Sequence, residues 1–173
     1  FSTISTYRKH VLAKISSCAM IGLNGHVIDV EVDSSNGLAS FTLVGLPDAA
    51  VKESGERVRA AIKHSGLHFP YNRVTVNLAP ADIKKAGPAY DLPIALGVLI
   101  ATEQLPPDAL ADTLIVGELA LDGGVRHVRG VLPTTAFARA SGFKRIIVPA
   151  CDAPEAALVP GIDVIAAENV GQL

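Results

Sequence analysis

The chain has 173 residues, of which 49% are hydrophobic and 5% aromatic, and its formal net charge is −2. This length suits one domain with a sizeable aliphatic core, and the near-neutral charge argues against a strongly basic nucleic-acid binder or an acidic tail. Basic residues outnumber acidic ones over residues 1–100, and the reverse holds over residues 101–173. An anion-binding surface is therefore expected on the first part of the chain.

The two cysteines, Cys18 and Cys151, are far apart and lack the spacing of a zinc knuckle or a disulfide framework. We expect both to be small buried apolar residues. The sequence has no apolar run of membrane-spanning length and no signal-peptide pattern, so the cytoplasm is the expected compartment. Residues 1–10 are expected to be a flexible lead-in and residues 11–173 a single domain.

The first part of the domain is predicted to be strand-rich. Strands are expected over residues 11–23, 26–32 and 39–43, with turns at Asn24-Gly25 and at residues 34–37. Apolar and polar residues alternate along the second and third strands. We therefore predict an antiparallel meander with one solvated face.

A helix is predicted from Asp48, as N-cap, to about Ser65. One of its faces is charged and includes Lys52, Glu56, Arg59 and Lys63. A solvated face with ion pairs is the ordinary interpretation of this stripe. The alternative is a contact face for phosphates or for a partner protein.

The centre of the chain combines a strand around Val74–Leu78, a loop and an entirely apolar helix over 92–101. A helix that is apolar on every side belongs in the middle of a domain. Asp91 stands where its N-cap is expected.

The loop before this helix carries Lys84 and Lys85. Helix N-termini favour anions, so these two lysines are candidate phosphate contacts. The alternative is that they only keep the loop soluble. Further basic residues could extend the same surface; these are Arg57, Arg59 and Lys63.

The remaining chain alternates strands and helices. Strands are predicted over 113–121, 125–128, 145–148 and 162–165, and helical segments over 133–140 and 154–158. This order predicts an α/β (α+β) fold: a two-layer sandwich with a mixed sheet and the helices mainly on one face.

Several common sites are not predicted. No glycine in the chain is followed by lysine, so the chain contains no P-loop, and it contains no Gly-x-Ser-x-Gly elbow. His64 and His68 have helical metal-pair spacing, but Gly66 between them should end the helix. We therefore predict no metal site and no cofactor in this chain.

Five longer motifs occur in order, and the resemblance that they carry extends over roughly residues 11–170: FTLVGLPDAAV (41–51), ERVRAAI (56–62), VNLAPAD (76–82), GPAYDLPIA (87–95) and GELALDG (117–123). Together they resemble the N-terminal domain of the magnesium-chelatase-like AAA+ ATPases, the ComM or YifB family. The resemblance implies a fold similar to the proteolytic domain of Lon, of the ribosomal S-five second-domain-like type. It also implies an ATPase module after this domain, with ATP and magnesium as its cofactors.

Lon proteases use a Ser-Lys dyad, and the resemblance locates its two positions here. The residue after Gly87-Pro88 is Ala89, and the position of the lysine is taken by Thr134. Neither residue supplies the missing chemistry, so peptidase activity is not expected.

The resemblance implies a non-catalytic module of a hexameric, DNA-acting ATPase, a branch-migration helicase of natural transformation. Its expected partners are single-stranded or branched DNA, its own ATPase module and the other subunits of the hexamer. The alternative is a subunit-assembly or protein-interaction domain of the same ATPase with no DNA contact of its own.

Overall fold

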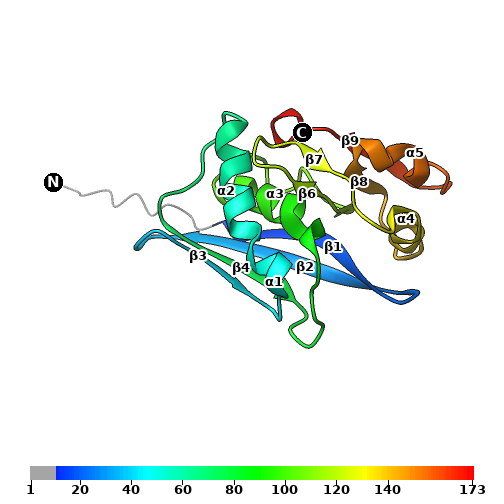
Figure 1. Cartoon of the computed structure of the whole chain (residues 1–173), viewed down its shortest axis with the longest axis horizontal. Coiled ribbons are helices and arrows are strands. Elements are labelled where there is room, and N and C mark those ends of the chain that lie inside the picture. Colours follow the sequence, from blue (N-terminus) through cyan, green and yellow to red (C-terminus); the bar gives the residue numbers. More distant parts are fainter. Residues whose placement is uncertain (1–10) are drawn as a thin grey trace.

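A computed structural model describes residues 11–173 of the chain, so the predicted lead-in at residues 1–10 lies outside the described residues (Figure 1). Its centre is a seven-stranded sheet in the order β3-β4-β2-β1-β5-β8-β9. The strands are β1 (Ala13–Ile21), β2 (Asn24–Ser35), β3 (Ser40–Val44), β4 (Arg73–Ala79), β5 (Thr113–Ile115), β8 (Arg145–Pro149) and β9 (Asp163–Ala167). A separate two-stranded sheet pairs β6 (Glu118–Leu119) with β7 (Val125–Arg126).

The predicted meander is wrong for its third strand. β1 and β2 pair antiparallel, as predicted. The strand on the other side of β2 is β4, and β3 pairs in parallel with β4. The helical segments between β3 and β4 carry the chain back across the sheet, which makes a parallel pairing possible. The sheet is thus mixed, with β2 as the one strand that runs against the other six.

The first hairpin turns two residues earlier than predicted. Ile21 pairs with Asn24, so Gly22 and Leu23 form the turn, and Gly22 supplies the positive φ of 62°. Gly25 has a different role: a Cβ there would lie only 2.2 Å from the Phe137 ring. The Asn-Gly pair therefore marks a close packing contact rather than the turn.

The helices are α1 (Ala49–Lys52), α2 (Ser54–His64), α3 (Asp91–Ala101), α4 (Val131–Ala140) and α5 (Ala153–Ala156). Short 3-10 turns are η1 (Pro88–Tyr90), η2 (Ala150–Asp152) and η3 (Val170–Gln172). Asp48 caps α1 as predicted, because its Oδ1 accepts a hydrogen bond from the Val51 N–H at 2.9 Å. The predicted single helix is broken at Glu53 into α1 and α2.

Helix α3 is the centre of the main core, and every residue from Asp91 to Ile100 is buried. It packs on β1 and β2 and contacts α2. The packing is close at Gly97, where a Cβ would lie 2.5 Å from Cγ2 of Val32. This confirms the prediction of a buried central helix.

The α/β sandwich with a mixed sheet is confirmed, but the helices divide between the two faces. Successive strand residues point to opposite faces of the sheet. In β8, Ile147 belongs to the main core, which contains α2 and α3. Its neighbours Ile146 and Val148 belong to a second core, which contains α4 and α5. Over the β5-β8-β9 half, α4 and α5 therefore cover the face opposite to α3. Within residues 11–173, no helix has the length and apolar character that crossing a membrane requires.

Six strands run the same way, so their carboxyl ends lie together at one end of the sheet. This end, where the strands finish, is here called the carboxyl edge. The loop over residues 80–87 follows β4 there, and η2 follows β8. Loops at this edge form ligand sites in many α/β proteins.

Candidate functional site

The lysine loop, residues 80–87, is held firmly at the carboxyl edge. The backbone of Lys85 exchanges two hydrogen bonds with the β3–α1 connection: its N–H donates to Leu46 O at 3.0 Å, and its carbonyl accepts from Asp48 N–H at 2.8 Å. The Gly87 N–H donates to Asp48 Oδ2 at 3.1 Å. Asp48 thus caps α1 with one carboxylate oxygen and fixes the lysine loop with the other.

The two adjacent lysines have opposite environments. Lys84 is exposed, whereas Lys85 is fully buried and its Nζ donates to the carbonyl oxygen of Pro80. Burial lowers the pKa of Lys85, because the interior disfavours the ammonium more than nearby Asp82 favours it. The structure therefore contradicts the prediction of a phosphate contact at Lys85. The physical reason is that Lys85 forms a β-bridge with Pro47. Successive side chains of an extended segment point to opposite sides, so Lys84 faces solvent and Lys85 faces the interior.

Arg57 is half-buried, and its guanidinium is engaged in an ion pair within the protein. Its Nε lies 2.6 Å from Asp91 Oδ2 and its Nη2 3.1 Å from Asp91 Oδ1, a bidentate pair. The Nη2 group donates in addition to Ala50 O at 2.7 Å. The hydrogen bond to Asp91 is the main reason that the pKa of Arg57 is raised.

Asp91 consequently does not cap α3 as predicted. Its carboxylate is fully buried and accepts further hydrogen bonds from Ser54 Oγ at 2.6 Å and from the Leu119 N–H at 3.1 Å. Burial raises its pKa, against the opposing effect of Arg57 and the other two donors. This network ties α2, α3 and β6 together.

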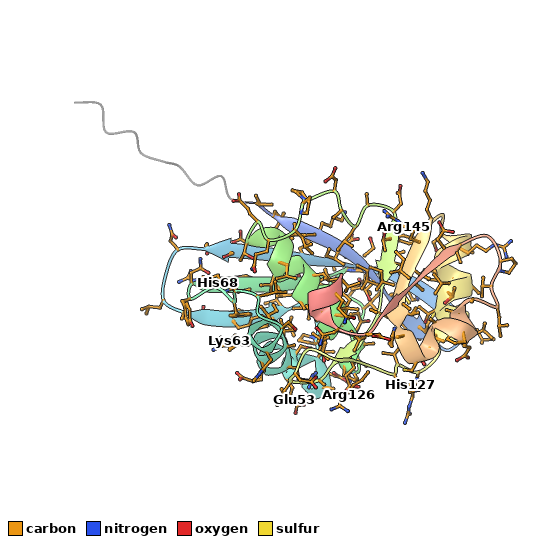
Figure 2. All side chains as sticks on the ribbon, turned by 90° about the horizontal axis from the view of Figure 1, so that it is seen from above. Glu53, Lys63, His68, Arg126, His127 and Arg145 are labelled. Carbon is orange, nitrogen blue, oxygen red and sulfur yellow. The ribbon has the colours of Figure 1, made fainter. Side chains whose placement is uncertain are left out.

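Arg59 and Lys63 lie on α2, away from the lysine loop. Arg59 Cζ lies 5.2 Å from the Phe69 ring centroid, and Lys63 Nζ lies 5.4 Å from that of Tyr71. The carboxyl end of α2 leads into the start of β4, so Lys63 is at the edge opposite to Lys84. Figure 2 shows Lys63 beside His68 and far from His127. The five predicted basic residues therefore do not form one surface.

A pocket of about 420 Å³ opens beside Lys84 at the carboxyl edge. Its walls include Ala89 and Thr134, the two positions assigned to the lost dyad, together with Cys18 and Tyr90. The structure thus brings these two positions, which are distant in sequence, to one site. Arg129, which is exposed, lines the same pocket and gives it a second cation.

The pocket does not contain an activated nucleophile among its described lining residues. Burial raises the pKa of Cys18 to about 11, although a side-chain hydrogen bond with Thr134 opposes the shift. The thiol is therefore protonated at neutral pH. Burial also raises the pKa of Tyr90, whose hydroxyl donates to Cys18 O at 3.3 Å. The arrangement is suited to binding rather than to covalent catalysis.

The chain matches a family of known proteins over most of its length. Residues 30–152 match the family model described as subunit ChlI of Mg-chelatase. The chain belongs to this family. The predicted magnesium-chelatase-like membership is thereby confirmed.

Two relatives of this ChlI-type chain match it over most of its length. The uncharacterized protein YifB of Escherichia coli strain K12 is 43% identical over 159 residues, which cover 92% of this chain and 31% of YifB. Competence protein ComM of Haemophilus influenzae is 45% identical over 148 residues, covering 86% of this chain and 29% of ComM. The chain spans about a third of the length of the curated relatives it matches.

A third relative supports the predicted Lon-like fold. Lon protease 2 of Bacillus subtilis is 25% identical over 174 residues, an alignment that covers 90% of this chain and 31% of that protein. The mixed sheet with helices agrees with that prediction.

Arg129 lies outside the predicted set of basic residues. The signal that indicates it is a basic run just before α4, formed by Arg126, His127 and Arg129. The prediction that both cysteines are buried holds only for Cys18. Cys151 is exposed, because it lies in η2, which turns it outward after β8.

Proposed function

We propose that this chain is the non-catalytic N-terminal module of an AAA+ ATPase that acts on DNA, and that it guides DNA toward the motor. Membership of the ChlI family and the likeness to ComM and YifB support a place in such an ATPase. In this proposal ATP and magnesium belong to a further module of the longer protein. The N-terminal module formed by this chain works in a cytoplasmic homo-hexamer, and it has lost the Lon-type peptidase chemistry.

The observation that carries the DNA contact is the pair of exposed cations, Lys84 and Arg129, on the walls of one pocket at the carboxyl edge. They come from loops that follow β4 and β7, so the fold rather than local sequence brings them together. Two cations on a rigid edge suit contact with consecutive phosphates without reading sequence. The contact should therefore be weak, salt-dependent and shared among six subunits.

The test is a fluorescence-anisotropy titration of labelled single-stranded, double-stranded and forked DNA at low and near-physiological salt. We expect Lys84→Glu and Arg129→Glu each to weaken binding at least about fivefold at low salt. Lys63→Glu is the matched control, because it makes the same change in net charge at the opposite edge. Equal losses in all three variants, or no binding at low salt, would contradict a DNA contact at the pocket.

The assembly alternative has an observation of its own. The β1–β2 hairpin ends in apolar side chains that face solvent, with Leu23 95% and Ile21 54% exposed. Such a tip suits burial against a neighbouring subunit. Loss of hexamer assembly in Leu23→Ser, measured by light scattering on the full ATPase, would favour this role; unchanged assembly would count against it.

A further inference from the structure

A second group of side chains gathers at the carboxyl edge, outside the pocket. His127, Cys151 and Asp152 each place one potential ligand atom within 4.8 Å of the others. Figure 2 shows His127 at the surface, away from His68. His64 and His68 do not belong to a three-ligand group of this kind among the described residues.

The fold buries one ligand of this group and leaves the other two at the surface. Asp152 is buried, and its Oδ2 accepts a hydrogen bond from the Val128 N–H at 2.9 Å. Its Oδ1 is hydrogen-bonded to Nδ1 of His127 at 2.5 Å. His127 and Cys151 are exposed, with 65% of the His127 side chain accessible. The carboxylate is thus a fixed anchor, while the imidazole and the thiol have room to adjust.

The donor set identifies the class of cation. A thiolate, an imidazole and a carboxylate are the ligands of zinc and similar borderline ions, whereas magnesium and calcium prefer oxygen ligands alone. Ligands about 2.0–2.3 Å from a tetrahedral ion are about 3.3–3.7 Å apart. Binding therefore requires the His127 ring to move away from Asp152 by about 1 Å or to turn and offer Nε2, and its exposure permits either change.

We propose that His127, Cys151 and Asp152 bind a zinc-class divalent cation, with a fourth position open to water or to another ligand. The ion links the connection between β7 and α4 to η2, two segments that meet only through tertiary structure. His127 directly precedes Val128 and Arg129, which line the pocket. Bound metal therefore fixes one wall of the pocket and the position of its Arg129 cation.

The test uses the purified metal-free chain and two probes. Titration with Co²⁺ should produce a thiolate-to-cobalt charge-transfer absorption that saturates at one ion per chain. Zn²⁺ should displace the cobalt and raise the melting temperature, because an ion that binds only the folded state stabilises it. Cys151→Ala should abolish the charge-transfer band, and His127→Ala should weaken Zn²⁺ binding at least about tenfold.

His64→Ala is the matched control, since it removes an exposed histidine from α2 and should leave both signals unchanged. Circular dichroism checks that each variant is folded. A cobalt spectrum and a zinc-dependent melting shift that persist in Cys151→Ala would overturn the proposal. The absence of both signals in the wild-type chain at millimolar metal would overturn it equally.

Discussion

Arg57 on α2 and Asp91 at the start of α3 form a bidentate ion pair, with N–O distances of 2.6 and 3.1 Å, although they lie 34 residues apart. Asp91 is fully buried, and only 19% of the Arg57 side chain is accessible. Two of the family-like motifs, 56–62 and 87–95, thus meet at one pair of residues. Their shared role is to fix α2 against the central helix.

Arg57→Ala should destabilise the fold by about 3–5 kcal/mol, because it leaves the buried Asp91 carboxylate without its counterion. The free energy of unfolding in urea measures this change. Arg126→Ala is the control: it removes an exposed arginine and should cost no more than about 0.5 kcal/mol. Similar small losses in both variants would show that the pair does not stabilise the structure.

Gly45 is expected to tolerate no side chain. Its φ is +105°, and a Cβ would lie 2.1 Å from the carbonyl oxygen of Leu78 on the neighbouring strand β4. Gly45→Ala should therefore cost about 3 kcal/mol from strain and overpacking together. Gly66→Ala is the matched comparison, since Gly66 also has a positive φ of 75° but has open space around it.

Gly66→Ala should cost only about 1–2 kcal/mol, the penalty of the left-handed backbone alone. Thermal and urea unfolding of both variants separate the two contributions. Equal losses would mean that the close approach of Gly45 to β4 is relieved by a small backbone shift.

Local periodicity predicted the elements that depend on neighbouring residues. The alternation in β4, the uninterrupted apolar run of α3 and the Asp48 cap all follow from residues within a few positions of one another. Strand pairing does not, because the partner of β3 depends on the long crossover through α1 and α2 rather than on the strand itself.

The candidate site was less predictable for the same reason. Lys84 and Lys85 are equivalent by composition, and only the contacts of Lys85 with Leu46 and Asp48 decide which one is buried. Asp91 has the composition of an N-cap, but its actual partner Arg57 is distant in sequence. The burial of a charged group depends on its tertiary partner, which a single sequence does not display.

The two thiols should differ sharply in reactivity. At neutral pH we expect an aromatic disulfide reagent to modify one cysteine per folded chain, Cys151, and two after denaturation. Cys18 is protected because it is buried and because its raised pKa of about 11 keeps the thiol protonated. Cys151→Ala should then show no rapid reaction in the folded state; rapid reaction of that variant would contradict the burial of Cys18.

Lys85 should make stability depend on alkaline pH. Its pKa is lowered in the folded state, so the unfolded chain binds more protons than the folded chain between that lowered value and the ordinary value of 10.5. Stability therefore rises with pH across this window and gains nothing further above it. Lys85→Met retains the buried apolar stem but removes the titrating amine.

We expect the free energy of unfolding of the wild type, measured relative to that of Lys85→Met in urea, to increase as the pH rises toward 10.5. The comparison cancels the opposite contribution of Cys18, which both proteins share: its folded pKa is raised from 9.0 to about 11, so stability falls as the pH rises through that interval. Lys84→Met is the matched control, because Lys84 is exposed, and it should follow the pH profile of the wild type. A constant difference between the wild type and Lys85→Met at all alkaline pH values would show that the buried amine carries the same charge in both states of the chain.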